Sequence, residues 1–180
     1  ELLDYYEGRE GRGFTIEVNG NGLEDRVQRL LERLSILDSE RAARYQKALA
    51  EFHSQAQFKE GVILPDPNDT FPLMIPVGCR IEVIVVQRVP VFPEDKRYVI
   101  QKSLWDRLSE VDQAGLVFHE IIYGEAITEG HTTSWDTRYL TGLWSSREFE
   151  SLSFQEHVRR LSLARFSHVF YGEYGNGHGD

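Results

Sequence analysis

The stretch AGLVFHEIIYG, residues 114–124, places His119 and Glu120 side by side in an otherwise apolar run. Histidine followed by glutamate begins HExxH, the zinc-peptidase motif in which two histidines bind the metal and the glutamate polarises its water. Here Tyr123 stands where the second histidine belongs. Residues four apart share one helix face, so His119 and Tyr123 are expected to lie one above the other. A phenol, with an ordinary pKa of about 10, binds metal poorly until it is deprotonated.

One hypothesis is a zinc site completed by ligands from outside this helix. His131 follows Gly130, where a chain reversal would return an imidazole toward the helix. Two histidines and a carboxylate are a sufficient set of protein ligands for catalytic zinc. The predicted metal ligands are therefore His119 and His131, with Glu120 or Glu125 as the third.

This zinc site would make the chain a divergent zinc-dependent hydrolase, either a peptidase or an amidase. Glu120 would be its general base, because the glutamate of HExxH activates the metal-bound water. Tyr123 or Arg138 would stabilise the oxyanion. The catalytic candidates under this hypothesis are thus Glu120, Tyr123 and Arg138.

The competing hypothesis is a buried polar network that fastens helices together. Ser134 and Arg138 are four residues apart in the next helical segment, SWDTRYLTGLWSS. Arg138 is expected to take Glu120 in a bidentate pair, because a carboxylate in an apolar helix has its pKa raised unless a cation compensates. Tyr123 would donate its hydroxyl, and His119 would bond Ser134 or a carbonyl. A metal-free ligand or catalytic site built from the same groups is a third alternative.

The helix that carries these residues is predicted over 110–129. Ser109 and Asp112 resemble a capping box at its start, and Gly130 follows its end. With two ionisable side chains in residues 114–124, this helix is expected to be buried, with Phe118 and Ile122 away from solvent.

The remaining elements frame this helix. Apolar residues at helical spacing predict a helical hairpin over residues 23–58. Strands are predicted at 13–18, in EGVIL at 60–64, at 79–89 and at 96–101. The last two are expected to pair antiparallel, and a proline-rich loop precedes them. The opening ELLDYYEG is expected to be helical.

We predict one α+β domain over 1–180, helix-rich, with a small antiparallel sheet around the buried central helix. Its parts are the hairpin 23–58, the sheet and HExxY core 60–146, and a C-terminal helix with a flexible glycine-rich tail, 147–180.

The composition argues against nucleic acid as a partner and against a membrane span. The chain carries 29 acidic and 20 basic residues, for a net charge of −9, so its overall field repels nucleic acid. No run reaches the roughly 18 apolar residues of a membrane span.

Cys79 has no second cysteine in the sequence to pair with and is interpreted as a small buried hydrophobe. The alternatives are a reactive thiol or a bridge to a missing segment.

Residues 79–146, together with ELLDYYEG, resemble a family of exported bacterial proteins of unknown function. Its members carry a D-x-A-x-L-x-x-H-E-x-x-Y helix followed by a Ser…Arg…Leu segment. The pattern's polar positions here are Asp112, His119, Glu120, Tyr123, Ser134 and Arg138. The resemblance implies export to the periplasm or beyond, and the absence of an initiator methionine suggests a processed chain. A signal peptide and a glycine-rich segment with another cysteine typically precede this region in the family, and Cys79 would be disulfide-bonded to such an upstream cysteine.

Two function classes follow from these observations. The first is a non-catalytic envelope or secreted module that needs no cofactor and binds a protein or cell-envelope partner. Its polar network consists of His119, Glu120, Tyr123, Ser134 and Arg138. The second is the Zn²⁺-dependent hydrolase. The sequence names no substrate for either.

Overall fold

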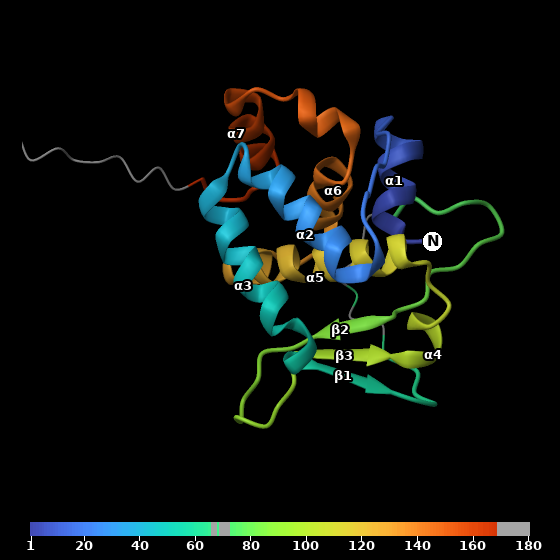
Figure 1. The fold of residues 1–180 in the computed structure, drawn as a ribbon. Helices are drawn as coiled ribbons and strands as arrows, with labels where there is room; N and C mark the ends of the chain where they lie inside the picture. Colours follow the sequence, from blue (N-terminus) through green and yellow to red (C-terminus); the bar gives the residue numbers. More distant parts are fainter. Residues whose placement is uncertain (66–67, 69–72, 169–180) are drawn as a thin grey trace, which may run out of the picture.

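The computed structural model describes residues 1–65, 68 and 73–168. Along this part of the chain the elements are α1 Leu3–Arg12, α2 Gly22–Ser35, α3 Ser39–Gln55, β1 Ala56–Lys59, β2 Val85–Gln87, β3 Tyr98–Gln101, α4 Lys102–Trp105, α5 Glu110–Thr128, α6 Trp135–Trp144, the short helix η1 Arg147–Ser151 and α7 Phe154–Leu163. Figure 1 shows α5 crossing the molecule between the other large helices and the sheet. The predicted α+β class is confirmed.

Helix α5 begins and ends where its sequence predicts. The Ser109 hydroxyl accepts a hydrogen bond from the backbone N–H of Asp112 at 3.1 Å, which caps the first turn. The helix stops before Gly130, whose φ of +87° is a backbone conformation that glycine adopts readily. Phe118 and Ile122 are fully buried. The prediction of a buried central helix is therefore confirmed.

The predicted helical hairpin is formed by α2 and α3. Its apolar stripe is buried against α5, and the first helix contributes Val27, Leu30, Leu31 and Leu34 to the core. Asp38 caps α3 by accepting from the backbone N–H of Arg41 at 3.0 Å. The second helix ends at Gln55, earlier than predicted, because the chain passes directly into β1.

The sheet is mixed, which corrects the prediction of an antiparallel sheet. Its order is β1-β3-β2. As predicted, β2 and β3 are antiparallel, with Val86 opposite Val99. β1 instead runs parallel to β3, with Ala56 opposite Tyr98. This strand was missed because its four residues, AQFK, lack the Val- and Ile-rich composition that marks strands.

The predicted strand at 79–89 is shorter than its composition suggested. Only Val85–Gln87 pairs with β3, and all of residues 80–87 line a cavity. The short strand predicted in EGVIL, residues 60–64, is not formed. Cys79 is exposed, so its assignment as a buried hydrophobe is wrong. The predicted strand 13–18 contributes a single bridge, between Ile16 and Ser146. Composition alone does not supply a strand with a partner.

Glycines allow α1 to approach α5 and α6 closely. A Cβ atom on Gly115 of α5 would lie 2.4 Å from the Tyr5 hydroxyl oxygen, and one on Gly142 of α6 would lie 3.2 Å from the Asp4 carbonyl oxygen. The backbone N–H of Leu2 also donates to Asp112 at 2.9 Å. These contacts place the start of α1 against the N-terminal half of α5.

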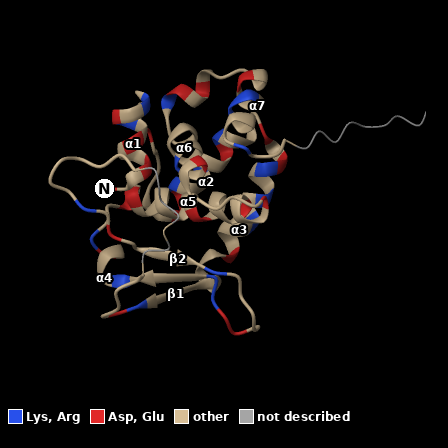
Figure 2. Ribbon diagram, turned by 180° about the vertical axis from the view of Figure 1, so that it is seen from behind, with Lys and Arg blue, Asp and Glu red and all other residues tan. Residues whose placement is uncertain are grey.

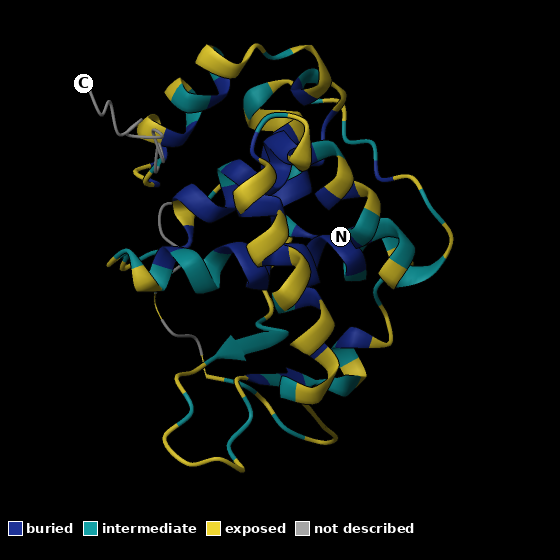
Figure 3. Cartoon of the chain, turned by 60° about the vertical axis from the view of Figure 1, so that its left-hand side comes forward, coloured by how far each residue is buried: buried dark blue, intermediate teal, exposed yellow. Residues whose placement is uncertain are grey.

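The helical layer and the sheet layer differ in how far their residues are buried. Figure 3 shows the fully buried residues gathered among the helices, whereas the sheet and its loops are mostly intermediate or exposed. Charged residues of both signs are interspersed along the chain in Figure 2. No helix in the described ranges is long and apolar enough to cross a membrane. Most of the glycine-rich tail, residues 169–180, lies outside the described residues.

Candidate functional site

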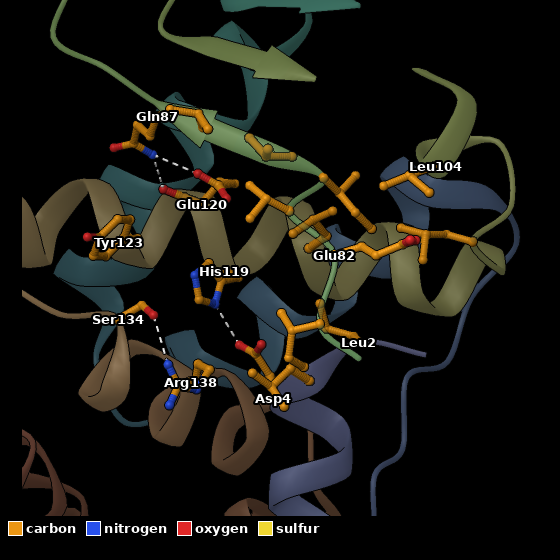
Figure 4. Close-up of a pocket in the computed structure, with 18 of the residues that line it drawn as sticks. Leu2, Asp4, Glu82, Gln87, Leu104, His119, Glu120, Tyr123, Ser134 and Arg138 are labelled. Carbon is orange, nitrogen blue, oxygen red and sulfur yellow. Dashed lines mark hydrogen bonds and ion pairs between the residues drawn. The ribbon is translucent and has the colours of Figure 1, made fainter. Parts of the chain in front are cut away.

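A cavity of about 410 Å³ lies between α5, the start of α1, the beginning of α6 and the segment 80–87. Figure 4 shows the side chains that surround it. One end is polar and is formed by Asp4, Gln87, His119, Glu120, Tyr123, Ser134 and Arg138. The remaining wall is mixed. Its apolar residues include Leu2, Val83, Val85, Leu104, Leu116 and Ile127, and its charged residues are Glu1, Arg80, Glu82 and Arg107.

His119 is paired with a carboxylate that the sequence analysis did not consider. Its Nδ1 lies 2.6 Å from Oδ1 of Asp4, and both residues are buried. The prediction that His119 would bond Ser134 or a carbonyl is therefore wrong. The residue it does bond is 115 positions away, on α1, and no local spacing rule reaches that far.

The pair shifts the pKa of both partners. Burial opposes protonation of His119, but the adjacent Asp4 carboxylate outweighs it and raises the pKa of the imidazole above 6.5. Burial likewise works against ionisation of Asp4, and His119 outweighs it, so that the pKa of the carboxyl falls below 3.8. The dyad is thus favoured as an ion pair, with Nδ1–H donating to the carboxylate.

The second ring nitrogen of His119 borders the cavity. Within the described residues Nε2 has no hydrogen-bond partner, and it is not among the polar atoms sealed from solvent. The ring stacks loosely on Tyr123 of the same helix face, at 5.9 Å between centroids. His119 is therefore held on one side and open on the other.

Arg138 is bound by Glu7 of α1. Its Nε donates to Oε2 of Glu7 at 3.0 Å, and its Nη1 donates to the Ser134 hydroxyl at 2.9 Å. All three residues are at most 4% exposed. The predicted ion pair between Arg138 and Glu120 is not formed within the described residues, because Glu7 is the carboxylate that binds Arg138. Glu7 lies 131 positions from Arg138, which a search among sequence neighbours could not find.

Glu120 is contacted from the sheet. The side-chain amide of Gln87, in β2, donates to the Glu120 carboxylate at 3.2 Å and to its backbone carbonyl at 2.8 Å. Because these contacts join β2 to α5, they fix the side of the cavity nearest the sheet (Figure 4).

The structure brings together the five residues predicted as a polar network, since all of them line the cavity: His119, Glu120, Tyr123, Ser134 and Arg138. It also adds Asp4, Glu7 and Gln87, which were missed. Asp4 and Glu7 carried a weak signal. They lie three apart in ELLDYYEG, on one helix face beside apolar residues.

His131 lies in a different cluster. Its Nε2 is 3.1 Å from the Arg165 carbonyl oxygen, its Nδ1 is 3.5 Å from Asp136, and its ring packs on Phe166. It does not line the cavity. The predicted zinc-ligand pair His119 and His131 is therefore not assembled, because the chain reversal at Gly130 directs His131 toward the segment after α7.

Glu125, the other proposed ligand, is also engaged elsewhere. Its carboxylate accepts from Arg41 Nε at 3.2 Å, from Arg44 at 3.1 Å and from the Tyr45 hydroxyl. Over residues 1–65, 68 and 73–168, no three His, Cys, Asp or Glu side chains are grouped so as to hold a metal ion. The donor set that the zinc hypothesis requires does not fit this geometry.

Comparison with protein-family models, curated proteins and solved structures found no match to this chain.

Proposed function

We propose that this chain is a binding module, without catalytic activity, that takes a small molecule into the cavity beside α5. The observation that carries the proposal is the cavity itself, about 410 Å³, with many apolar wall residues, a few charged ones and a polar end. Ligand pockets in proteins have this size and this composition, with a few polar groups that orient the ligand.

The buried polar network supports the proposal by giving the cavity fixed walls. The pair Asp4–His119 joins α1 to α5, the pair Glu7–Arg138 joins α1 to α6, and Gln87 joins β2 to α5. Separating the joined elements would take buried charges away from these partners, so the elements that surround the cavity are held in one arrangement. A preorganised site loses less entropy when it binds.

We also propose that the protein acts in the periplasm or outside the cell. The resemblance to exported bacterial proteins supports an envelope or secreted module, in the periplasm or outside the cell, with a ligand or partner from that environment. The full-length precursor tests this directly. An export signal ahead of this region is expected, and a precursor that stays in the cytoplasm would contradict it.

The binding proposal is tested with methyl octanoate as a probe, by titration followed through backbone amide chemical shifts. We expect shifts confined to residues around the cavity. Leu104→Trp and Val83→Trp each add bulk to the apolar wall and should weaken binding at least tenfold.

Ile36→Trp is the matched control, because Ile36 is 80% exposed at the end of α2 and lies outside the cavity. It should leave the affinity unchanged. Binding that survives both cavity substitutions would refute the proposal.

The sequence-based alternative, a zinc-dependent hydrolase with Glu120 as general base, makes a different prediction for elemental analysis. For protein purified without added metal or a histidine tag, we expect less than one zinc per chain. Stoichiometric zinc that is lost on His119→Ala would favour the hydrolase over the binding module.

A further inference from the structure

At the polar end of the cavity, the second ring nitrogen of His119 has no hydrogen-bond partner among the described residues. Asp4 occupies Nδ1 of His119 at 2.6 Å, and Nε2 borders the cavity without a partner there. Because Asp4 favours the protonated ring, Nε2 carries a hydrogen that can be donated. A ligand that reaches this end therefore meets a charge-assisted N–H donor.

The charges around this donor limit the ligand's own charge. Two cations, His119 and Arg138, are each paired with a carboxylate, Asp4 and Glu7 respectively. Glu120 adds a third carboxylate, which acts on His119 electrostatically. Glu7 also lies 3.6 Å from Arg12. The carboxylates of Asp4 and Glu7 are thus both balanced by cations, and Glu120 places a further negative charge beside His119. An anionic head group would be repelled by Glu120 and would have to lose its hydration as well.

A cationic head group meets a different obstacle. It would bring its own N–H donors toward Nε2–H of His119 and toward the guanidinium of Arg138, which are both donors. A neutral acceptor, such as a carbonyl oxygen, avoids both penalties. It accepts from Nε2–H and brings no charge into the cavity.

We propose that the cavity binds a neutral amphiphile, an acyl ester or amide, whose carbonyl oxygen accepts a hydrogen bond from Nε2 of His119 while its hydrocarbon chain lies along the apolar wall. This inference rests on the proposed binding function and names the class of ligand. Asp4 is a positioning residue in this arrangement, because it holds the ring through Nδ1 and leaves Nε2 on the opposite edge of the ring (Figure 4).

Three probes with the same chain length test the inference on the wild-type protein: methyl octanoate, octanoate and octylammonium. Their dissociation constants are measured by amide shift titration at about pH 6, below the ordinary pKa of histidine. We expect methyl octanoate to bind about tenfold more tightly than either charged probe, the usual effect of one hydrogen bond to a charged donor. Equal binding of all three would overturn the ligand class and leave the binding function intact. Tighter binding of either charged probe would also overturn the ligand class. Failure of all three to bind would overturn both proposals.

Two substitutions assign the donor. His119→Phe keeps a ring of similar shape without N–H groups, and it should remove the preference for the ester. His53→Phe is the matched control, because His53 is exposed on α3 and pairs with Glu24 at 2.8 Å, away from the cavity. It should retain the full preference.

His119→Gln covers the case in which His119→Phe fails to fold, since glutamine keeps an N–H donor without the ring. We expect the affinity ratio of ester to charged probe in this variant to stay within about threefold of the wild-type ratio. A threefold change is smaller than the usual contribution of one neutral hydrogen bond. Loss of the preference in Tyr123→Phe, with the preference intact in His119→Phe, would overturn the assignment to His119.

Discussion

Helix α5 carries two buried ionic clusters that differ in what lies beside them. One is the cavity cluster, formed by Asp4, Glu7, His119 and Arg138. The other is the Arg41 cluster, in which Arg41 contacts Asp38, Glu125 and the Ser167 carbonyl oxygen, with Arg44 and Tyr45 also on Glu125. No residue of the Arg41 cluster lines the cavity.

The two clusters differ in whether their polar groups are all paired within the protein or leave one group that a ligand can reach. In the Arg41 cluster the guanidinium is enclosed by two carboxylates and a carbonyl, and its exposed fraction is 1%. In the cavity cluster the pairs are as buried, yet His119 keeps one nitrogen on the cavity. Burial and ion pairing alone therefore do not identify a site; the open hydrogen-bonding position does.

The largest effect is expected from Arg41→Met, which leaves Asp38 and Glu125 without their shared cation. The free energy of unfolding should fall by about 5 kcal/mol, the upper end for breaking a buried ion pair. Arg44→Met is the matched control, because Arg44 is 53% exposed and also contacts Glu125; its loss should cost less than about 1 kcal/mol. Urea denaturation measures both, and equal losses would show that the Arg41 cluster is not structural.

A smaller loss, about 3 kcal/mol, is expected from Arg138→Met, which removes the nearer cation from the buried Glu7 and leaves Arg12 at 3.6 Å. Combining it with Glu7→Gln should cost clearly less than the sum of the two single losses. Chemical denaturation of the two single variants and the double variant gives the coupling energy.

The same cycle with Glu120→Gln distinguishes the two carboxylates. Glu120→Gln and Arg138→Met are expected to be nearly additive, because Glu120 is contacted by Gln87 while Glu7 binds Arg138. A larger coupling of Arg138 with Glu120 than with Glu7 would reverse the assignment made from the structure.

The pH dependence of stability separates the clusters further. The raised pKa of His119 stabilises the fold fully below pH 6.5, and this contribution is lost as pH rises through the raised value. The lowered pKa of Asp4 contributes above 3.8 and is lost as pH falls through the lowered value. Both contributions are present between 3.8 and 6.5. A tenfold difference in proton affinity between the folded and the unfolded protein corresponds to about 1.4 kcal/mol.

In the Arg41 cluster, the pKa of Asp38 is lowered to about 2 despite its burial, by His157 and Arg41, so its contribution is lost only in acid. The loss of stability above pH 6.5 should therefore depend on the cavity cluster. Unfolding of wild type and His119→Gln, compared inside the window and above it, measures this. A loss of the same size in both proteins would contradict the assignment.

The smallest effect is expected from Ser134→Ala, which removes one hydrogen bond to Arg138. The loss should be about 1–2 kcal/mol, as for other hydrogen bonds to charged groups. Ser35→Ala is the control, since that exposed hydroxyl donates to the Glu32 carbonyl in the last turn of α2, and it should change stability by less than about 0.5 kcal/mol. Equal effects in a thermal or urea series would mean that Ser134 does not support Arg138.

The sequence by itself determined α5, the α2–α3 hairpin and the meeting of His119, Glu120, Tyr123, Ser134 and Arg138. These features depend on local physics. Apolar periodicity specifies a buried helix, a serine caps it, and a glycine ends it, so residues on one helix face and on the next segment come together.

Only the tertiary structure decided the partners. Asp4 rather than Ser134 binds His119, Glu7 rather than Glu120 binds Arg138, and β1 is parallel to β3. Each contact joins residues far apart in the chain, and the type and spacing of a residue do not specify which distant carboxylate will be brought to it. Docking of α1 at Gly115 and Gly142 makes that choice, because the absence of a Cβ atom there allows the first helix to lie where its carboxylates reach the imidazole and the guanidinium.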